Sequence, residues 1–139
     1  MPAHQATLTI KTSGRGLFEF TDAVAAEVRR SGIATGFASV FCMHTSCSLV
    51  IMENADPSVR ADLEAWMDRL VPDGDARFTH HAEGPDDMPA HIKMAVTRTS
   101  ESIPITGGRL RLGTWQGLYL WEHRSAPHNR MVVVTVIGM

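Results

Sequence analysis

The alternation of apolar and polar residues predicts strands along much of the chain. Residues 6–12 (ATLTIKT) place Leu8 and Ile10 on one side and polar residues on the other, the pattern of a strand with one buried face. Residues 37–43 (FASVFCM) and 47–52 (CSLVIM) are nearly continuous apolar runs of strand length, which is typical of strands covered on both faces. Four further strands are predicted at residues 103–106, 110–112, 114–122 and 131–137.

Helical spacing and end signals predict the first two helices. Apolar residues recur on one helical face over residues 21–30, and Gly32 ends this helix. Asp56 and Pro57 mark the clearest helix start, because the aspartate can cap free N–H groups and proline suits the first helical position. Apolar residues at helical spacing then continue the second helix to Leu70.

A further helix and the order of the elements together predict the fold class. This helix begins within residues 86–89 (DDMP) and continues through Val96, with two aspartates near its positive end. Two or three helices among about seven strands predict an α+β fold with mainly antiparallel β-sheets in a sandwich-like arrangement. No repeat or long linker divides the chain, so we expect a single domain over residues 1–139. Consecutive strands that are apolar on both faces indicate either two packed layers or a buried contact between subunits.

The composition is that of a soluble globular protein, with 44% hydrophobic and 20% charged residues. Lys and Arg number 13 against 15 Asp and Glu, so there is no basic excess and we expect no nucleic-acid partner. No segment resembles a signal peptide, and no apolar run reaches the roughly 18 residues of a membrane helix. We therefore expect a cytoplasmic protein without a membrane partner, in which Cys42 and Cys47 are reduced.

Residues 79–91 (THHAEGPDDMPAH) contain three histidines and three carboxylates, which raises the question of a metal site. His80 and His81 are neighbours and point to opposite sides of an extended backbone, so at most one of them joins a common site. His91 is held by the predicted helix. The spacing matches no recognised metal motif such as HExxH, and taken alone it is better explained by a solvated polar loop around a helix start.

A second polar cluster lies between the two apolar runs, where residues 41–47 (FCMHTSC) include His44, Thr45 and Ser46. An imidazole beside two hydroxyl groups suits an anion or a metal-bound water, although a histidine packed in the core or in a simple turn explains His44 as well. Glu53 follows the second run, and a carboxylate at the end of a buried strand requires a partner or solvent.

A third cluster lies in residues 112–118 (LGTWQGL), where two glycines bracket Thr114, Trp115 and Gln116. We expect Trp115 in the core and Gln116 as a buried amide that requires hydrogen-bonding partners. Glu122 lies six residues beyond Gln116, which is about 20 Å along a straight strand. A bulge or a neighbouring subunit would have to bring these two side chains to one site.

Taken together, these clusters resemble the YjbQ-like family. The resemblance is carried by HTSCSLVIMENADPSVRADL, EGPDDMPAHIK and SESIPITGGRLRLGTWQGLYLWEHR, and it covers essentially the whole chain from Phe41 to Gly138. Cys47 stands where that family usually has a small residue, and Phe78 where a tyrosine is common. The resemblance implies an α+β fold assembled as a homotrimer, with polar pockets near the subunit contacts.

The resemblance also implies a function and a metal site. Members of the family have been associated with a secondary thiamine-phosphate synthase activity, which joins the pyrimidine diphosphate and the thiazole phosphate of thiamine. Histidines that match His44, His80 and His91 look like the family's metal-binding set, whereas His81 has no clear counterpart.

Two functional hypotheses follow. In the first, the protein is an enzyme that acts on a small phosphorylated molecule with a divalent metal, zinc, at His44, His80 and His91. The hydroxyl groups expected to bind phosphate belong to Thr45, Ser46 and Thr114. The side chains expected to orient the substrate or act as a base belong to Glu53, Gln116 and Glu122. In the second, the protein is a non-catalytic trimer that binds a metal or a phosphorylated metabolite. A third reading gives the histidines a role in joining the trimer, and the roles of His81 and His123 stay open.

Overall fold

The computed structural model describes residues 2–139 and confirms an α+β fold with antiparallel sheets and three helices. In chain order the elements are β1 (Ala3–Thr12), β2 (Gly16–Glu19), α1 (Thr21–Ser31), β3 (Thr35–Cys42), β4 (Cys47–Glu53), α2 (Pro57–Leu70), α3 (Asp87–Ala95), β5 (Ser100–Thr106), β6 (Arg109–Leu110), β7 (Gln116–Glu122) and β8 (His128–Gly138). None of the helices in residues 2–139 has both the length and the apolar content that crossing a bilayer requires.

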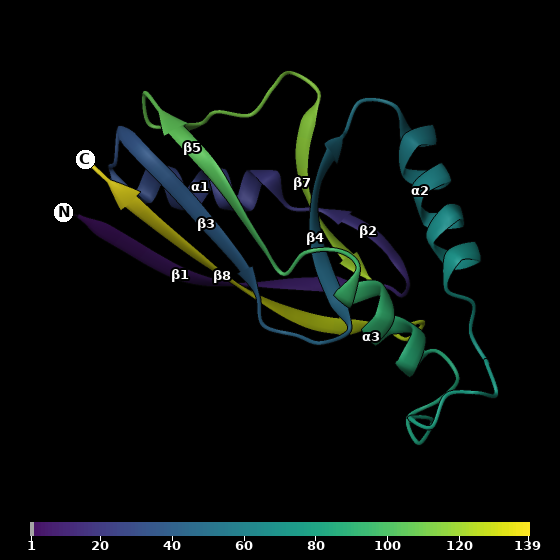
Figure 1. Cartoon of the computed structure of the whole chain (residues 1–139). Coiled ribbons are helices and arrows are strands. Elements are labelled where there is room, and N and C mark those ends of the chain that lie inside the picture. Colours follow the sequence, from purple (N-terminus) through teal and green to yellow (C-terminus); the bar gives the residue numbers. More distant parts are fainter. Residues whose placement is uncertain (1) are drawn as a thin grey trace.

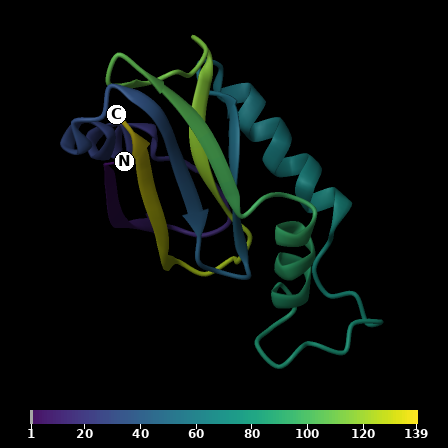
Figure 2. The same ribbon diagram turned by 60° about the vertical axis from the view of Figure 1, so that its left-hand side comes forward.

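The strands form two sheets. The larger sheet has the order β1-β8-β3-β5-β6 and the smaller one has the order β2-β7-β4, and neighbouring strands are antiparallel throughout. In Figure 1 the larger sheet faces the viewer and α1 lies behind it. Figure 2 shows α2 on the side of β4 and β7 that faces away from the larger sheet.

Both sheets turn apolar faces toward one core. Val40 of β3 and Val134 of β8 meet Leu49 of β4 and Leu120 of β7, and none of these side chains is more than 1% exposed. Val24 of α1 belongs to the same cluster. Burying each such side chain contributes about 1.5–3 kcal/mol, so the apolar runs seen in the sequence hold the two layers together.

Helices α2 and α3 begin as their sequences predict and frame the outer side of the smaller sheet. The Asp56 carboxylate accepts a hydrogen bond from the Ser58 backbone N–H at 2.9 Å, with Pro57 in the first turn of α2. Met67 of α2 is buried against Tyr119 and Trp121 of β7. The long segment of residues 71–86 joins the C-terminal end of α2 to the N-terminal end of α3 and extends away from both sheets (Figure 2).

Three features differ from the sequence-based expectation. The sequence does not predict β2, because its four residues GLFE are too few to establish an alternating pattern. The strand expected from residue 114 begins at Gln116, since the Gln116 N–H donates to the Gly113 carbonyl oxygen at 3.0 Å and closes a turn. Trp115 lies in that turn with 62% of its surface exposed, so the prediction that it belongs to the core is wrong for the single chain.

Candidate metal centre

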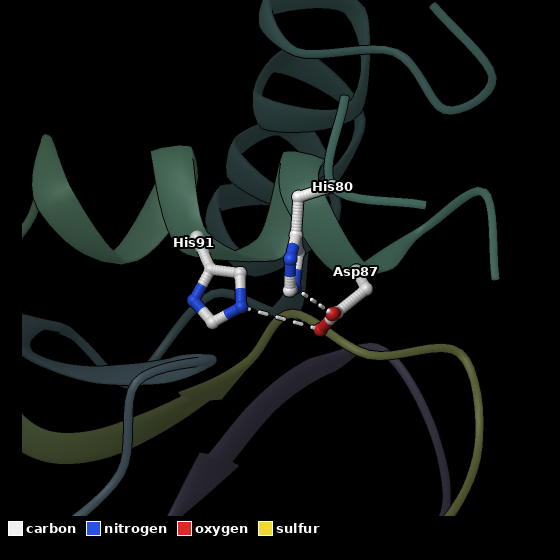
Figure 3. A group of neighbouring side chains, drawn as sticks. All are labelled: His80, Asp87 and His91. Atoms are coloured by element: carbon white, nitrogen blue, oxygen red, sulfur yellow. Dashed lines mark hydrogen bonds and ion pairs between the residues drawn. The ribbon is translucent and has the colours of Figure 1, made fainter. Parts of the chain in front are cut away.

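Three side chains that could hold a metal ion lie close together at the first half of α3: His80, Asp87 and His91 (Figure 3). Asp87 and His91 are four residues apart on α3 and therefore share one face of the helix. His80 reaches them from the preceding segment. One ligand atom from each residue lies within 4.8 Å of the others. His80 Nε2 is 2.7 Å from Asp87 Oδ2, and His91 Nε2 is 3.4 Å from Asp87 Oδ1.

The hydrogen bond of His91 to Thr45 fixes which ring nitrogen carries the hydrogen when the ring is neutral. His91 Nδ1 lies 2.9 Å from the Thr45 carbonyl oxygen, which can only accept, so Nδ1 carries the hydrogen. In the neutral ring the lone pair of Nε2 then faces an oxygen of the Asp87 carboxylate. Two acceptors in this arrangement repel each other unless a second proton or a metal cation lies between them.

The surroundings of Asp87 keep it ionised. Its side chain is 2% exposed, and Arg124 Nη1 donates to its Oδ1 at 3.0 Å. Burial acts to raise the pKa of Asp87, but the hydrogen bond to His80 and the charge of Arg124 outweigh burial and lower that pKa. The neighbouring Asp86 accepts hydrogen bonds from Arg124 Nε at 3.0 Å and from the Ser125 N–H at 2.9 Å. Arg124 is therefore the cation that holds both carboxylates in place.

The donor set fits a divalent cation of the zinc type. Two imidazoles and one carboxylate are a common set of protein ligands in zinc sites that keep a position open for water or substrate. Ligand atoms about 2.0–2.1 Å from a tetrahedral ion lie roughly 3.3 Å from one another, compared with 3.4 Å from His91 Nε2 to Asp87 Oδ1 and a hydrogen-bonding 2.7 Å from His80 Nε2 to the other oxygen, Oδ2. The contact between His91 and Thr45 is of the same kind as the outer hydrogen bonds that orient histidines in metal sites. The His80 side chain is 52% exposed, so solvent or a ligand can reach the group.

A surface cavity of about 360 Å³ adjoins this group. His80 and His81 both line it, together with Phe78, Met88 and Pro89. His81 is therefore beside the cavity but outside the group of three ligands, in keeping with the expectation that at most one of the adjacent histidines joins the site. The cavity has room for a small molecule next to His80.

The group formed by the described residues of one chain contains two of the three predicted histidines and does not include His44. His44 Nε2 accepts a hydrogen bond from the Met131 backbone N–H at 2.7 Å, which leaves the ring proton on Nδ1. Asp87 takes the third position. The sequence predicts Asp87 only as a residue that favours the helix start, although its spacing of four residues from His91 is a usable signal. Ligation by His44 stays a prediction.

Glu53 and Gln116 lie together at one end of the smaller sheet. Thr45, which contacts His91, precedes the opposite end of β4. Glu53 and Gln116 are paired across β4 and β7. The Glu53 carboxylate accepts from the Asp56 N–H at 3.0 Å, and Gln116 Oε1 accepts from the Gly113 N–H at 2.8 Å. Gln116 is exposed, so the prediction of a buried amide is wrong for the single chain. Thr114 lies exposed in the adjoining turn.

Glu122 and Ser46 belong to a buried polar network beneath the turn that joins β3 and β4. Glu122 is 0% exposed and is ion-paired with Arg130, while Thr12 Oγ1 donates to its Oε1 at 2.8 Å. Ser46 Oγ accepts from Arg130 Nη2 at 2.9 Å. Thr45, the next residue in the turn, contributes its carbonyl oxygen to His91. Of the predicted catalytic and phosphate-binding residues, Thr45 is therefore the one that contacts a ligand of the candidate centre directly.

Comparisons with known proteins match this chain over nearly its whole length. The family described as UPF0047 protein YjbQ-like matches residues 6–139. A UPF0047 protein from Synechocystis sp. is 54% identical over 97% of this chain and 92% of its own length. The crystal structure of an uncharacterised yjbq/upf0047 family protein from Clostridium acetobutylicum is 37% identical, covers 96% of this chain and 98% of its own, and superposes with a TM-score of 0.82. A hypothetical protein from Aeropyrum pernix is 27% identical, covers 97% and 98% of the two chains, and has a TM-score of 0.88.

Proposed function

The chain belongs to the YjbQ-like UPF0047 family, and we propose that it binds a divalent cation, zinc, through His80, Asp87 and His91. The observation that carries this proposal is the approach of His91 Nε2 to the Asp87 carboxylate at 3.4 Å, while His91 Nδ1 donates its hydrogen to the Thr45 carbonyl oxygen. A cation bound to both atoms removes their repulsion. Thr45 and Arg124 act as the outer partners, since Thr45 orients the His91 ring and Arg124 fixes the Asp87 carboxylate.

With the cation bound, the site is suited to an enzyme that acts on a small phosphorylated substrate. A zinc ion supplies a Lewis acid that polarises a phosphoryl oxygen and offsets charge on a leaving group. The cavity of about 360 Å³ beside His80 receives the substrate, and His81 on its wall is available to donate a hydrogen bond to phosphate. The reaction to test first is the formation of thiamine phosphate from the pyrimidine diphosphate and the thiazole phosphate.

A non-catalytic role is the second candidate, and the placement of the predicted bases favours it. Glu122 is buried in an ion pair with Arg130, and Glu53 lies at the far end of the smaller sheet. A protein that captures a metal or a phosphorylated metabolite requires no general base, so the same ligands and cavity would serve it.

Turnover assays separate the two candidates. Purified protein is incubated with both thiamine precursors, before and after chelator treatment and after zinc is restored. The enzyme hypothesis predicts product that disappears with chelator, returns with zinc and is lost in His91→Ala. His81→Ala is the matched control for cation binding, because His81 lies beside the group without joining it. Product that persists in His91→Ala and under chelator contradicts the metal-enzyme proposal, and a bound cation without turnover favours the binding protein.

The protein assembles as a homotrimer through the outer face of the larger sheet. This face carries exposed apolar side chains of β3 and β8 among polar ones such as Ser39 and Thr135, and it lies open in the single chain on the side of the sheet turned away from α1 (Figure 1). Phe37 and Phe41 of β3 are 42% and 49% exposed, and Met131 of β8 is 38% exposed. Cross-strand partners of the two phenylalanines, Ile137 and Val133, extend the same face. Light scattering coupled to size-exclusion chromatography tests this assembly against a monomer.

A further inference from the structure

Cys42 and Cys47 face each other where the chain passes from the larger sheet to the smaller one. Cys42 is the last residue of β3 and Cys47 is the first residue of β4. Their Sγ atoms lie 3.1 Å apart, and both cysteines are free. A disulfide bond has a sulfur–sulfur distance of about 2.05 Å, so an approach of roughly 1 Å would join the two sulfurs.

We propose that Cys42 and Cys47 form a redox-active dithiol that is reversibly oxidised to an intramolecular disulfide, with a peroxide as oxidant and a dithiol as reductant. The peroxide transfers one oxygen atom to the Cys42 thiol, so that Cys42 becomes a sulfenic acid. The peroxide is reduced to an alcohol, or to water in the case of hydrogen peroxide. The Cys47 sulfur then attacks the sulfenic sulfur. The sulfur–sulfur bond forms, the sulfur–oxygen bond breaks, and water leaves with the Cys47 proton. A dithiol restores both thiols by exchange and is itself oxidised to a disulfide.

The sheets hold the two sulfurs in reach of each other. Cys42 is paired with Val132 of β8, and Cys47 is paired with Glu122 of β7. Because each cysteine is fixed by a neighbouring strand, the folded chain raises the effective concentration of one thiol at the other above its value in a flexible chain. Both cysteines are at most 2% exposed, whereas Met43, in the turn of residues 43–46 that joins them, is 55% exposed. Oxidation therefore requires local opening of this turn to admit the peroxide to the pair.

The disulfide would close a covalent ring around the turn of residues 43–46. Within that turn the Thr45 carbonyl oxygen accepts from His91 Nδ1 at 2.9 Å, and Ser46 Oγ accepts from Arg130 Nη2 at 2.9 Å. Oxidation thus restrains the turn that orients His91. A link between oxidation and cation binding rests on the proposed function, whereas formation of the disulfide itself does not.

Redox titration of the full chain tests the proposal. Protein is equilibrated in buffers with an increasing ratio of oxidised to reduced glutathione, both folded and in urea, then quenched with acid, unfolded and treated with a maleimide. We expect a disulfide species that takes up no maleimide and has a mass two hydrogens lower. We expect the equilibrium constant for its formation to be at least tenfold larger in the folded chain than in urea. Thiols that stay fully reactive in the folded chain, or a preference for the unfolded chain, would overturn the proposal.

A second arm uses hydrogen peroxide followed by dithiothreitol. Loss of two hydrogens that dithiothreitol fully reverses supports the proposal, and irreversible gain of two oxygens on one cysteine contradicts it. Cys42→Ser and Cys47→Ser should each abolish the lighter species, while the comparison of folded and unfolded wild type needs no variant. His91→Ala should form the same disulfide, so failure of the cation site leaves this result unchanged.

Discussion

Glu122 provides a sharp test of which polar groups hold the fold and which are free for chemistry. Arg130 Nε donates to its Oε1 at 2.8 Å, and the Arg130 side chain is itself 5% exposed. Glu122→Gln keeps the size of the side chain but removes its charge. The Arg130 guanidinium is then left buried without a counter-charge, and Thr12 loses a charged acceptor.

The magnitude follows from the burial of both partners. Removing one member of a buried ion pair costs about 3–5 kcal/mol, a large share of the 5–15 kcal/mol that stabilises a typical domain. Urea unfolding followed by tryptophan fluorescence, at one fixed protein concentration, measures the free energy of unfolding. The double variant Glu122→Leu with Arg130→Met should regain most of the loss, because apolar replacement of both charges leaves neither one unpaired.

The outcome also decides whether Glu122 acts as a base. A loss below about 1 kcal/mol would refute the structural account of the pair. So would a stable Glu122→Gln protein that keeps its bound cation yet loses turnover, since that result would place Glu122 in contact with substrate.

Three further predictions concern pH, assembly and strand pairing. Burial, together with the charges of Lys93, Arg130 and Arg15, lowers the pKa of His123 to about 3. Between that pKa and the unfolded value of about 6.5, the unfolded chain binds more protons than the folded chain, so the free energy of unfolding falls as the pH falls. The loss from pH 6.5 to 5 is about 1.6 kcal/mol, and equal pH slopes for wild type and His123→Gln in urea unfolding would contradict this. If the proposed trimer forms, Phe41→Glu should convert it to monomers in light scattering, and an unchanged mass would exclude the open sheet face as the interface. Gly36→Ala should destabilise the fold in thermal unfolding, because a Cβ at residue 36 would collide with the Ile137 carbonyl oxygen across the β3–β8 pair; an unaltered melting temperature would contradict that close approach.

Local signals explain what the sequence predicts well. The Asp56 cap and Pro57 act within one turn of α2, so its start at Pro57 is visible without knowledge of the fold. The strands β3, β4 and β8 are predicted because their apolar runs are long enough to require burial. In contrast, β2 is recognisable as a strand through its pairing with β7, a contact over a hundred residues away along the chain.

The candidate site was predictable in part for the same reason. Asp87 and His91 lie four residues apart on one helix, so their proximity follows from local geometry. The family resemblance points to His80 and His91, but the approach of His80 to α3 depends on the path of the segment before the helix. The orientation of His44 depends on the Met131 N–H of a distant strand, and no spacing in the sequence indicates that contact. Trp115 is exposed because it lies in a turn closed by Gly113 and Gln116 just before β7. The apolar residues around it in the sequence predict a strand there, so the sequence does not reveal this turn.

Elemental analysis of bound cation is the most direct test of the proposed centre. Wild type, His91→Ala and the control His81→Ala are stripped with chelator, loaded with zinc, dialysed and analysed for metal per chain. We expect one zinc per chain in wild type and in His81→Ala, and an affinity at least about tenfold weaker in His91→Ala. Wild-type protein that retains no zinc, or His91→Ala that retains as much as wild type, would contradict this expectation.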